Sequence, residues 1–128
     1  MKKVLMLIND TTYAYNLRGA LIRRLLREKY NVVVVAQFLE HVEHLMSIGC
    51  KLIEVRTNRH SINPLSDLNL KRFYKKILKS ERPDVVLSYN IKPNIYGGMS
   101  CRELNIPFIA NITGLGTPLE RKSKIRKR

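Results

Sequence analysis

Residues 84–98 read DVVLSYNIKPNIYGG, and this stretch decides the fold. It opens with a short apolar run, which is typical of a strand buried on both faces of a parallel sheet. Polar residues follow at once, and Pro93 then suits the first turn of a helix. The stretch therefore predicts a strand-to-helix junction. In open α/β sheets, ligands bind at such junctions, outside the carboxyl ends of the strands.

The same alternation extends along the rest of the chain. Short apolar or β-branched runs predict strands at residues 3–8, 31–36, 50–55, 83–88 and 106–111. Apolar residues at helical spacing predict helices at residues 17–30, 39–49, 67–81 and 93–104. Strands that alternate with helices predict a doubly wound parallel sheet. With right-handed crossovers, the expected fold class is α/β, a Rossmann-like sheet of about five strands in the order 3-2-1-4-5.

Local signals add detail to the first and third helices. Residues 9–16, NDTTYAYN, are polar and predict a loop before the first helix. Within that helix, Leu17, Leu21 and Leu25 recur every four residues, so we expect them on its apolar, buried face. Ser66 is predicted to cap the third helix.

The chain is strongly basic. Its 128 residues carry a formal charge of +14, and six of the 24 basic residues lie in RKSKIRKR at residues 121–128. Without these six the charge falls from +14 to +8, so the rest is basic too. Negatively charged partners are implied, whether nucleic acid, anionic lipid headgroups or phosphorylated substrates. We expect one domain at residues 1–117 and a disordered basic tail at residues 118–128.

Several classes of protein are disfavoured. The apolar runs are too short for a membrane span of ~20 residues or a secretory signal core of ~7–15, which predicts a cytosolic protein. Cys50 and Cys101 form no metal or redox motif and are expected to be buried or idle thiols. His41 and His44 are expected on a solvated helix face and not in a metal site. The glycine pair at residues 97–98 is expected to let a helix pack closely on the sheet.

The loops after the strands should line a single crevice. They are polar, cationic and rich in amides, and they contain few carboxylates. Such a rim suits a ligand with hydroxyls and phosphates, and it argues against a catalytic pair of carboxylates. The loop after the first strand lacks the GxGxxG pattern, which excludes an ordinary dinucleotide-binding domain.

Within this rim, Lys92 lies near a helix N-terminus, where its charge opposes the helix dipole. An anion contact and a plain solvent lysine both stay open for it. His60, in a post-strand loop, is a candidate for a substrate contact. Gly114 and Gly116 belong either to a plain turn or to a backbone that approaches a phosphate.

The order of motifs from residue 3 to residue 116 resembles the N-terminal domain of family 4-like glycosyltransferases. The segments YNIKPNIYGG (89–98) and ITGLG (112–116) are the most specific parts of this resemblance. These are bacterial enzymes of capsule, exopolysaccharide and O-antigen synthesis. The resemblance implies a GT-B architecture of two Rossmann-like domains with the active site between them. The N-terminal domain then meets the acceptor, a glycan or a polyprenyl-diphosphate-linked glycan, and the C-terminal domain holds a nucleotide sugar. It implies no metal and no cofactor.

The resemblance also assigns residues to the cleft. Lys92 and Asn94 match a loop that faces it, and the ITGLG segment matches a second one. The stretch YAYNLR stands where the family has a version containing histidine, so no catalytic residue is assigned. The residues predicted to line the acceptor cleft are Asn9, Tyr13, Asn16, Arg18, His60, Tyr89, Asn90, Lys92, Asn94, Thr113, Gly114 and Gly116.

The chain departs from the resembling enzymes in length, because the donor-binding domain is missing. We expect either a truncated chain or one half of a split enzyme, inactive alone, in the cytoplasm or peripheral at the inner face of the cell membrane. The alternative is a non-enzymatic basic α/β module that binds nucleic acid or an anionic membrane surface. The placement of the motifs in loops, not in helices, favours the transferase, and nucleic acid is not an expected partner.

Overall fold

The computed structural model describes residues 2–56 and 64–112. Five strands, β1 (Lys3–Asp10), β2 (Asn31–Gln37), β3 (Lys51–Glu54), β4 (Val85–Tyr89) and β5 (Phe108–Asn111), form one parallel sheet in the order β3-β2-β1-β4-β5. This confirms the expected Rossmann-like topology. The strand ends differ from the prediction by only one or two residues.

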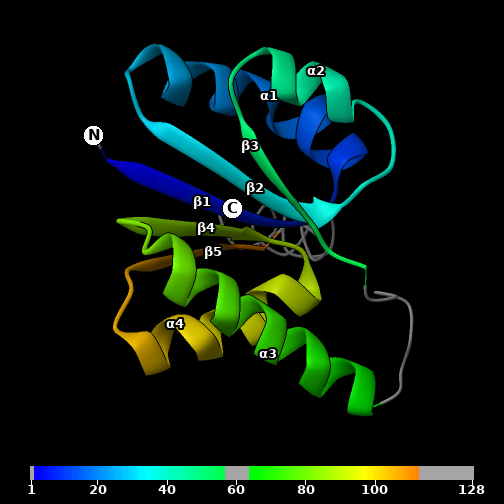
Figure 1. The fold of residues 1–128 in the computed structure, drawn as a ribbon, viewed down its shortest axis with the longest axis vertical. Helices are drawn as coiled ribbons and strands as arrows, with labels where there is room; N and C mark the ends of the chain where they lie inside the picture. The colour runs from blue at the N-terminus through cyan, green and yellow to red at the C-terminus, as the bar shows by residue number, and fades with distance from the viewer. Residues whose placement is uncertain (1, 57–63, 113–128) are drawn as a thin grey trace, which may run out of the picture.

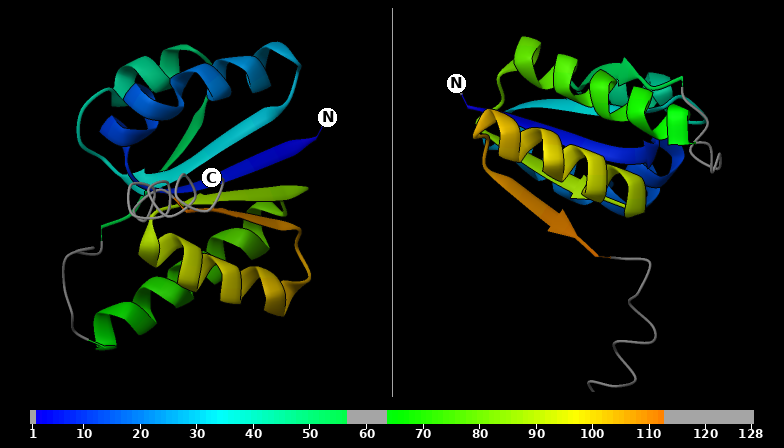
Figure 2. Two further views of the ribbon diagram at one scale, coloured as in Figure 1. Left: turned by 180° about the vertical axis from the view of Figure 1, so that it is seen from behind. Right: turned by 90° about the horizontal axis from the view of Figure 1, so that it is seen from below.

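Helices cover both faces of the sheet (Figure 1). The helices α1 (Thr11–Arg27) and α2 (Val42–Ser47) lie on one face, and α3 (Pro64–Glu81) and α4 (Gly98–Leu104) lie on the other, as Figure 2 also shows. The π-helical segment η1 (Pro93–Gly97) leads directly into α4. The sheet is therefore the middle layer of three.

The central strand β1 supplies side chains to both cores. Leu5 and Leu7 pack in the cluster that contains the buried residues of α3. Met6 and Ile8 pack in the opposite cluster, with Ile22 of α1. Because successive side chains of a strand point to opposite faces, one apolar run can fill two cores. This explains why the run 3–8 shows no polar alternation.

The start of α1 differs from the prediction. Residues 11–16 are helical and not a loop, because the side chain of Asp10 caps the helix. The backbone N–H of Tyr13 donates to Asp10 Oδ1 at 2.7 Å. A carboxylate at this position satisfies an N–H group that the first turn leaves free. The polar residues after β1 therefore belong to a capped helix.

The buried face of α1 differs too. Leu17 is 60% exposed and Leu21 is 37% exposed, whereas Ala14 and Ile22 are fully buried. Leu25 is half-buried. The prediction was wrong because a helix has 3.6 residues per turn, so leucines spaced four residues apart drift around its surface. The face that packs on the sheet is the one that carries Ala14 and Ile22.

The other helix boundaries shift for local reasons. α3 begins at Pro64, so Ser66 is its third residue and not its cap. Proline suits a first helical position because its missing N–H would have no partner there. α2 is shorter than predicted, because His41 before it adopts a left-handed conformation with φ 67°.

The two glycines at residues 97–98 sit against the sheet, as predicted. A Cβ atom on Gly97 would collide with Cδ1 of Leu7, and one on Gly98 would lie 3.1 Å from the Phe108 ring. Leu7 is fully buried, so its side chain has little freedom to yield. Glycine therefore allows η1 and α4 to approach β1 and β5 closely.

The two edges of the sheet differ in character. The edge strand β3 carries Lys51 and Glu54 at its ends. The edge strand β5 carries no charge, and its Ile109 is 53% exposed. Charged residues on an edge discourage pairing with another chain, and uncharged apolar residues do not.

Both cysteines are buried, and burial raises the pKa of the Cys50 and Cys101 thiols to about 11 each. They are therefore protonated and unreactive at neutral pH, as expected. Within residues 2–56 and 64–112, every helix is too short or too polar to traverse a bilayer.

Glu81, at the end of α3, joins two strands at the amino-terminal edge of the sheet. It accepts from Lys51 Nζ at 2.7 Å and from Lys3 Nζ at 3.0 Å, and its side chain is only 8% exposed. The Lys51 ammonium, with that of Lys3, holds the pKa of Glu81 below its ordinary value.

We expect Gly97→Ala to lower the free energy of unfolding by about 1–3 kcal/mol, because the added methyl overpacks the core against Leu7. Urea titration followed by circular dichroism measures the loss. Arg102→Ala, an exposed change in α4, is the matched control and should stay within about 0.5 kcal/mol. Equal stability of Gly97→Ala and the wild type would mean that the glycine is not needed for close packing.

We expect Glu81→Gln to lower the free energy of unfolding by about 1–3 kcal/mol at pH 7, because two charge-assisted hydrogen bonds weaken. A lowered pKa stabilises the native state above the unfolded pKa of about 4.3, and this contribution is lost as the pH falls through the native pKa. The difference between variant and wild type should therefore shrink in acid. Glu28→Gln, whose pair with Arg24 is exposed, is the control; a Glu81→Gln deficit that does not depend on pH would contradict the account.

Candidate functional site

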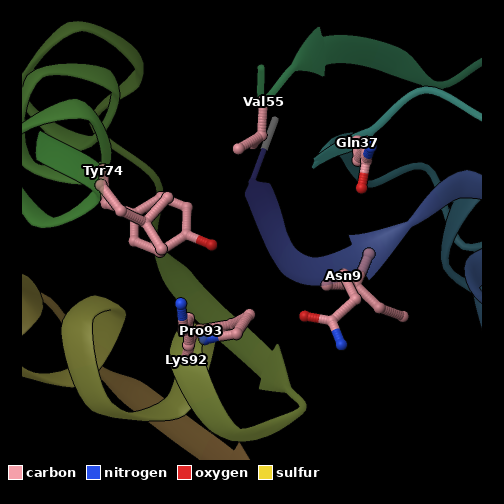
Figure 3. Close-up of a pocket in the computed structure, with 8 residues that line it drawn as sticks. Asn9, Gln37, Val55, Tyr74, Lys92 and Pro93 are labelled. Carbon is pink, nitrogen blue, oxygen red and sulfur yellow. The ribbon is translucent and has the colours of Figure 1, made fainter. Parts of the chain in front are cut away.

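The carboxyl ends of the first four strands surround a pocket (Figure 3). Its enclosed space is small, about 10 Å³, which is room for roughly one water molecule, and it opens to solvent. Apolar side chains and polar side chains both line it, namely Ile8, Asn9, Gln37, Val55, Leu70, Tyr74, Lys92 and Pro93. β1 and β4 are neighbours in the sheet although two strands separate them in sequence, so the pocket lies where the strand order reverses. This is the place where open α/β sheets bind ligands.

Three of the lining residues carry polar groups that could contact a ligand, namely Asn9, Tyr74 and Lys92. Figure 3 shows the hydroxyl of Tyr74 directed into the space between α3 and the strand ends, and the nitrogen of Lys92 near the Tyr74 ring, whereas the carboxamide of Asn9 is directed away from Tyr74. Tyr74 is almost fully buried, and burial raises the pKa of its hydroxyl, so that group stays a neutral donor. An ammonium together with neutral donors suits a ligand that presents phosphate or hydroxyl oxygens.

Lys92 is not a plain solvent lysine. Its Nζ lies 2.9 Å from Oδ1 of Asp67, and the two side chains are 21% and 23% exposed. The hydroxyl of Tyr96, one turn further along the same helix, donates to Oδ2 of Asp67 at 3.0 Å. The Lys92 ammonium, with this hydroxyl, lowers the pKa of Asp67. The three residues form a bridge between α3 and η1 that fixes the ammonium at the pocket.

Asparagines hold the loops around the pocket together. The backbone N–H of Asn9 donates to Oδ1 of Asn90 at 3.0 Å, and Asn90 adopts a left-handed conformation with φ 78°. The side-chain nitrogen of Asn94 donates to the carbonyl of Asn111 at 3.1 Å. Asn111 in turn donates from its side chain to the carbonyl of Ser88 at 3.2 Å. Asn90 and Asn94 therefore set the shape of the turn after β4.

A second group of predicted residues lies on the α1 side of the sheet. The guanidinium carbon of Arg18 is 4.6 Å from the ring centroid of Tyr89, a cation–π contact. Tyr89 is only 3% exposed, and burial raises the pKa of its hydroxyl. Tyr13 is half-buried in the first turn of α1, and Asn16 is exposed on that helix.

The structure thus brings together part of the predicted set. Asn9 and Lys92 line the pocket, while Asn90 and Asn94 support its rim. Arg18, Tyr89 and Tyr13 form the separate group beside α1, and Asn16 is exposed on that helix. The remaining candidates, His60, Thr113, Gly114 and Gly116, lie outside the described residues.

Sequence reasoning missed four residues of the site. Gln37 is the last residue of β2; it falls at the strand ends, where the crevice was predicted, although it was not among the predicted site residues. Tyr74 occurs within the apolar face of α3, where its spacing is the same as that of a core residue. Asp67 pairs with Lys92, which lies 25 residues later in the sequence, and Tyr96 donates to the same carboxylate. No local sequence pattern predicts such a pairing.

His41 and His44 were predicted on one helix face, but only His44 lies within α2. His41 precedes α2, and its Nδ1 lies 3.2 Å from Nδ1 of His44 while both rings stack on Tyr15. In the part of the chain that the structure describes, no three or more histidine, cysteine or acidic residues are arranged to hold a metal ion.

Comparison with known proteins gives two findings from sequence. A family model described as glycosyl transferase 4-like matches residues 3–127. A curated relative is the N,N'-diacetylbacillosaminyl-diphospho-undecaprenol alpha-1,3-N-acetylgalactosaminyltransferase of Campylobacter jejuni, which is 30% identical over 104 residues. The match covers 80% of this chain and 28% of the relative, so the chain spans just over a quarter of that protein.

Solved structures share the fold. A glycosyltransferase from Rickettsia africae superposes with a TM-score of 0.68 at 19% identity, over 85% of this chain and 29% of that one. MurG of Acinetobacter baumannii superposes with a TM-score of 0.68 at 20% identity, over 88% of this chain and 35% of that one. The C-terminal domain of a Pyrococcus furiosus hydrogenase superposes with a TM-score of 0.66 at 15% identity, over 86% of this chain and 90% of that one. These likenesses show the fold alone, since unrelated functions share it.

Proposed function

Because the chain belongs to the glycosyl transferase 4-like family, we propose that it forms the acceptor-side domain of a glycosyltransferase. The enzyme would transfer a sugar from a nucleotide sugar to a lipid-linked glycan acceptor in surface polysaccharide synthesis. The observation that carries the proposal is the pocket at the strand ends, which both Lys92 and Tyr74 line.

The chemistry of the pocket supports an acceptor that carries a diphosphate. Lys92 supplies a positive charge at the start of a helix, where backbone N–H groups and the helix dipole also favour anions. The Asn9 side chain both donates and accepts, which suits sugar hydroxyls. The name of the Campylobacter relative states a diphospho-undecaprenol acceptor, and we propose the same chemical class here.

We further propose that the nucleotide sugar is held by a second domain, contributed by polypeptide other than residues 3–127. The relative is several times longer than the matched region, which leaves room for such a domain. In this two-domain GT-B arrangement the present chain binds and orients the acceptor. Holding two substrates in reactive geometry supplies much of the rate of a transfer reaction. No catalytic residue is assigned to this chain.

We also propose that the protein lies at the cytoplasmic face of the membrane, and the exposed surface of α3 supports this. One stripe of this helix is exposed and combines Leu65 and Leu68 with the cations Arg72, Lys76 and Lys79. Lys71 and Lys75 are not part of the stripe, because both pair with Glu103 of α4. Leucines with adjacent cations suit an anionic bilayer surface. The leucines are at the end of α3 that is nearest the pocket, so a lipid-linked acceptor could reach it.

We expect Lys92→Ala to lower kcat/KM for transfer by about 10- to 100-fold, because a charge-assisted hydrogen bond to the acceptor is lost. The assay joins this chain to the remaining length of the Campylobacter relative and supplies nucleotide sugars with lipid-linked acceptor extract. Asn94→Ala should have a smaller effect, through the shape of the turn.

Arg27→Ala, an exposed change at the far end of α1, controls for the loss of a positive charge and should leave transfer unchanged. Thermal melting of each variant separates misfolding from lost binding. The unjoined chain should give no turnover. Transfer by the unjoined chain would contradict the proposed division of substrates, and unchanged transfer by Lys92→Ala would contradict the proposed acceptor site.

We expect the chain to sediment with liposomes that contain anionic lipid, and less so as salt increases, since screening weakens contacts between exposed charges. Replacing Arg72, Lys76 and Lys79 together by Gln should reduce sedimentation, whereas replacing Arg23, Arg24 and Arg27 of α1, which removes the same charge, should have less effect. Tighter binding to RNA than to liposomes at equal ionic strength would favour the alternative of a basic nucleic-acid-binding module.

A further inference from the structure

A row of exposed apolar side chains runs from the turn before η1 into α4. Ile91, Ile95 and Met99 follow one another at intervals of four residues and are 69%, 49% and 44% exposed. Residues four apart lie on the same side of a helix, so the three side chains form one stripe. We name it the η1–α4 stripe. Apolar side chains gathered on one exposed surface mark a contact with a partner or a membrane.

The contacts of the neighbouring positions show which way the stripe faces. Each member is followed directly by a residue that contacts α3, namely Lys92, Tyr96 and Ser100. One position further on, Pro93 and Gly97 are buried, and Gly97 packs against β1. The stripe therefore lies on the side of the helix that is turned away from the sheet, next to the contact with α3.

The exposed stripe of α3 borders the same contact from its other side. Asp67 and Lys71 face η1 and α4, because both form ion pairs with residues of those helices or of the turn before them. Leu68 and Arg72, each one residue later, are exposed. Figure 2 shows α3 and α4 next to one another on this face of the sheet. The two stripes thus make one outer surface, apolar near the start of both helices and cationic toward the end of α3.

We propose that this outer surface lies on an anionic phospholipid bilayer and that the η1–α4 stripe enters the boundary between headgroups and acyl chains. The inference rests on the proposed position of the protein at the membrane, and it adds the element that inserts. The cations of α3 then lie at the level of the headgroups. Because η1 begins at the strand ends, the carboxyl edge of the sheet lies beside the bilayer in this orientation.

The charges beside the stripe favour a bilayer over a protein partner. The core of a protein interface is depleted of charged residues, whereas here Arg72 and Lys76 continue the row that begins with Leu68. The carboxylates between the two helices, Asp67 and Glu103, both pair with lysines. They therefore add no unbalanced negative charge that would repel an anionic surface.

The two stripes make separable contributions to binding. The attraction between the cations of α3 and the headgroups weakens as salt screens it. Burial of apolar side chains does not depend on charge and persists at high salt. The wild type should therefore keep part of its affinity for vesicles at a salt concentration where the electrostatic part is lost.

The experiment measures partition of the full chain into phosphatidylglycerol vesicles at about 0.1 M and about 1 M sodium chloride, which shortens the screening length about threefold. At the higher concentration, Ile95→Ser combined with Met99→Ser should lower partition about tenfold, because apolar burial is lost. Leu17→Ser combined with Leu21→Ser is the matched control. It removes side chains that are 60% and 37% exposed from α1, on the opposite face of the sheet, and should leave partition unchanged.

Tryptophan fluorescence gives a second readout. The chain has no tryptophan, so Ile95→Trp reports on the stripe alone. Its emission should shift to the blue on addition of vesicles and should be quenched by brominated lipid, whereas Leu17→Trp should show neither change. Melting curves identify a serine variant that fails to fold, in which case the tryptophan pair decides the question.

Equal partition of the wild type and the Ile95→Ser, Met99→Ser variant at high salt, or no quenching of Ile95→Trp, would overturn the inference while the cations of α3 remain the membrane contact. Absence of wild-type binding at low salt would overturn the membrane position itself. A third result would assign the stripe to a protein contact: blue-shifted Ile95→Trp emission without vesicles, in the chain joined to the remaining length of the Campylobacter relative.

Discussion

The exclusion of β1 from water on both faces is the constraint on which the rest of this domain depends. Its residues Val4 to Ile8 are almost completely buried, with odd and even positions in different cores. Helices must therefore cover both sides, and crossovers of one hand bring the strands into parallel order. All five strands then end at the same edge of the sheet. The pocket at that edge is a consequence of burying β1, and its chemistry is decided by the residues that happen to follow each strand.

The polar residues at that edge divide into those that build the site and those that are available to a ligand. Most asparagines of the turn after β4 bond to backbone groups, and they maintain a backbone that would otherwise be strained at Asn90. Lys92 is held by the carboxylate of Asp67 in α3, which also accepts from the Tyr96 hydroxyl in η1. This amount of internal bonding gives the pocket a fixed shape before any ligand arrives, and fixed donors lose less entropy on binding.

The sequence was sufficient for the topology because the strands are short, apolar and regularly separated by helices, and few arrangements satisfy such a pattern. It was also sufficient for the close packing at Gly97, since two adjacent glycines beside a strand have few other uses. It failed for the buried face of α1, where three leucines at a spacing of four suggested a face that the sheet does not cover. It failed likewise for Asp67, Tyr74 and Tyr96, because their roles arise only when α3 folds over the turn after β4. Long-range contacts between side chains leave no periodicity to detect.

The two edges of the sheet differ in how readily they could pair with another strand. At β3 the ends carry charges, one of them Lys51, which is held by Glu81, and these charges disfavour pairing with another strand. At β5 the backbone groups of the outer side have no neighbouring strand in the described residues, and Ile109 offers an apolar contact beside them. A polypeptide that extends this sheet would therefore join beside β5 and not beside β3. Such an extension would lengthen the row of strand ends on the side of Asn94 and Asn111, so the carboxyl edge of the sheet can widen without any change to its centre.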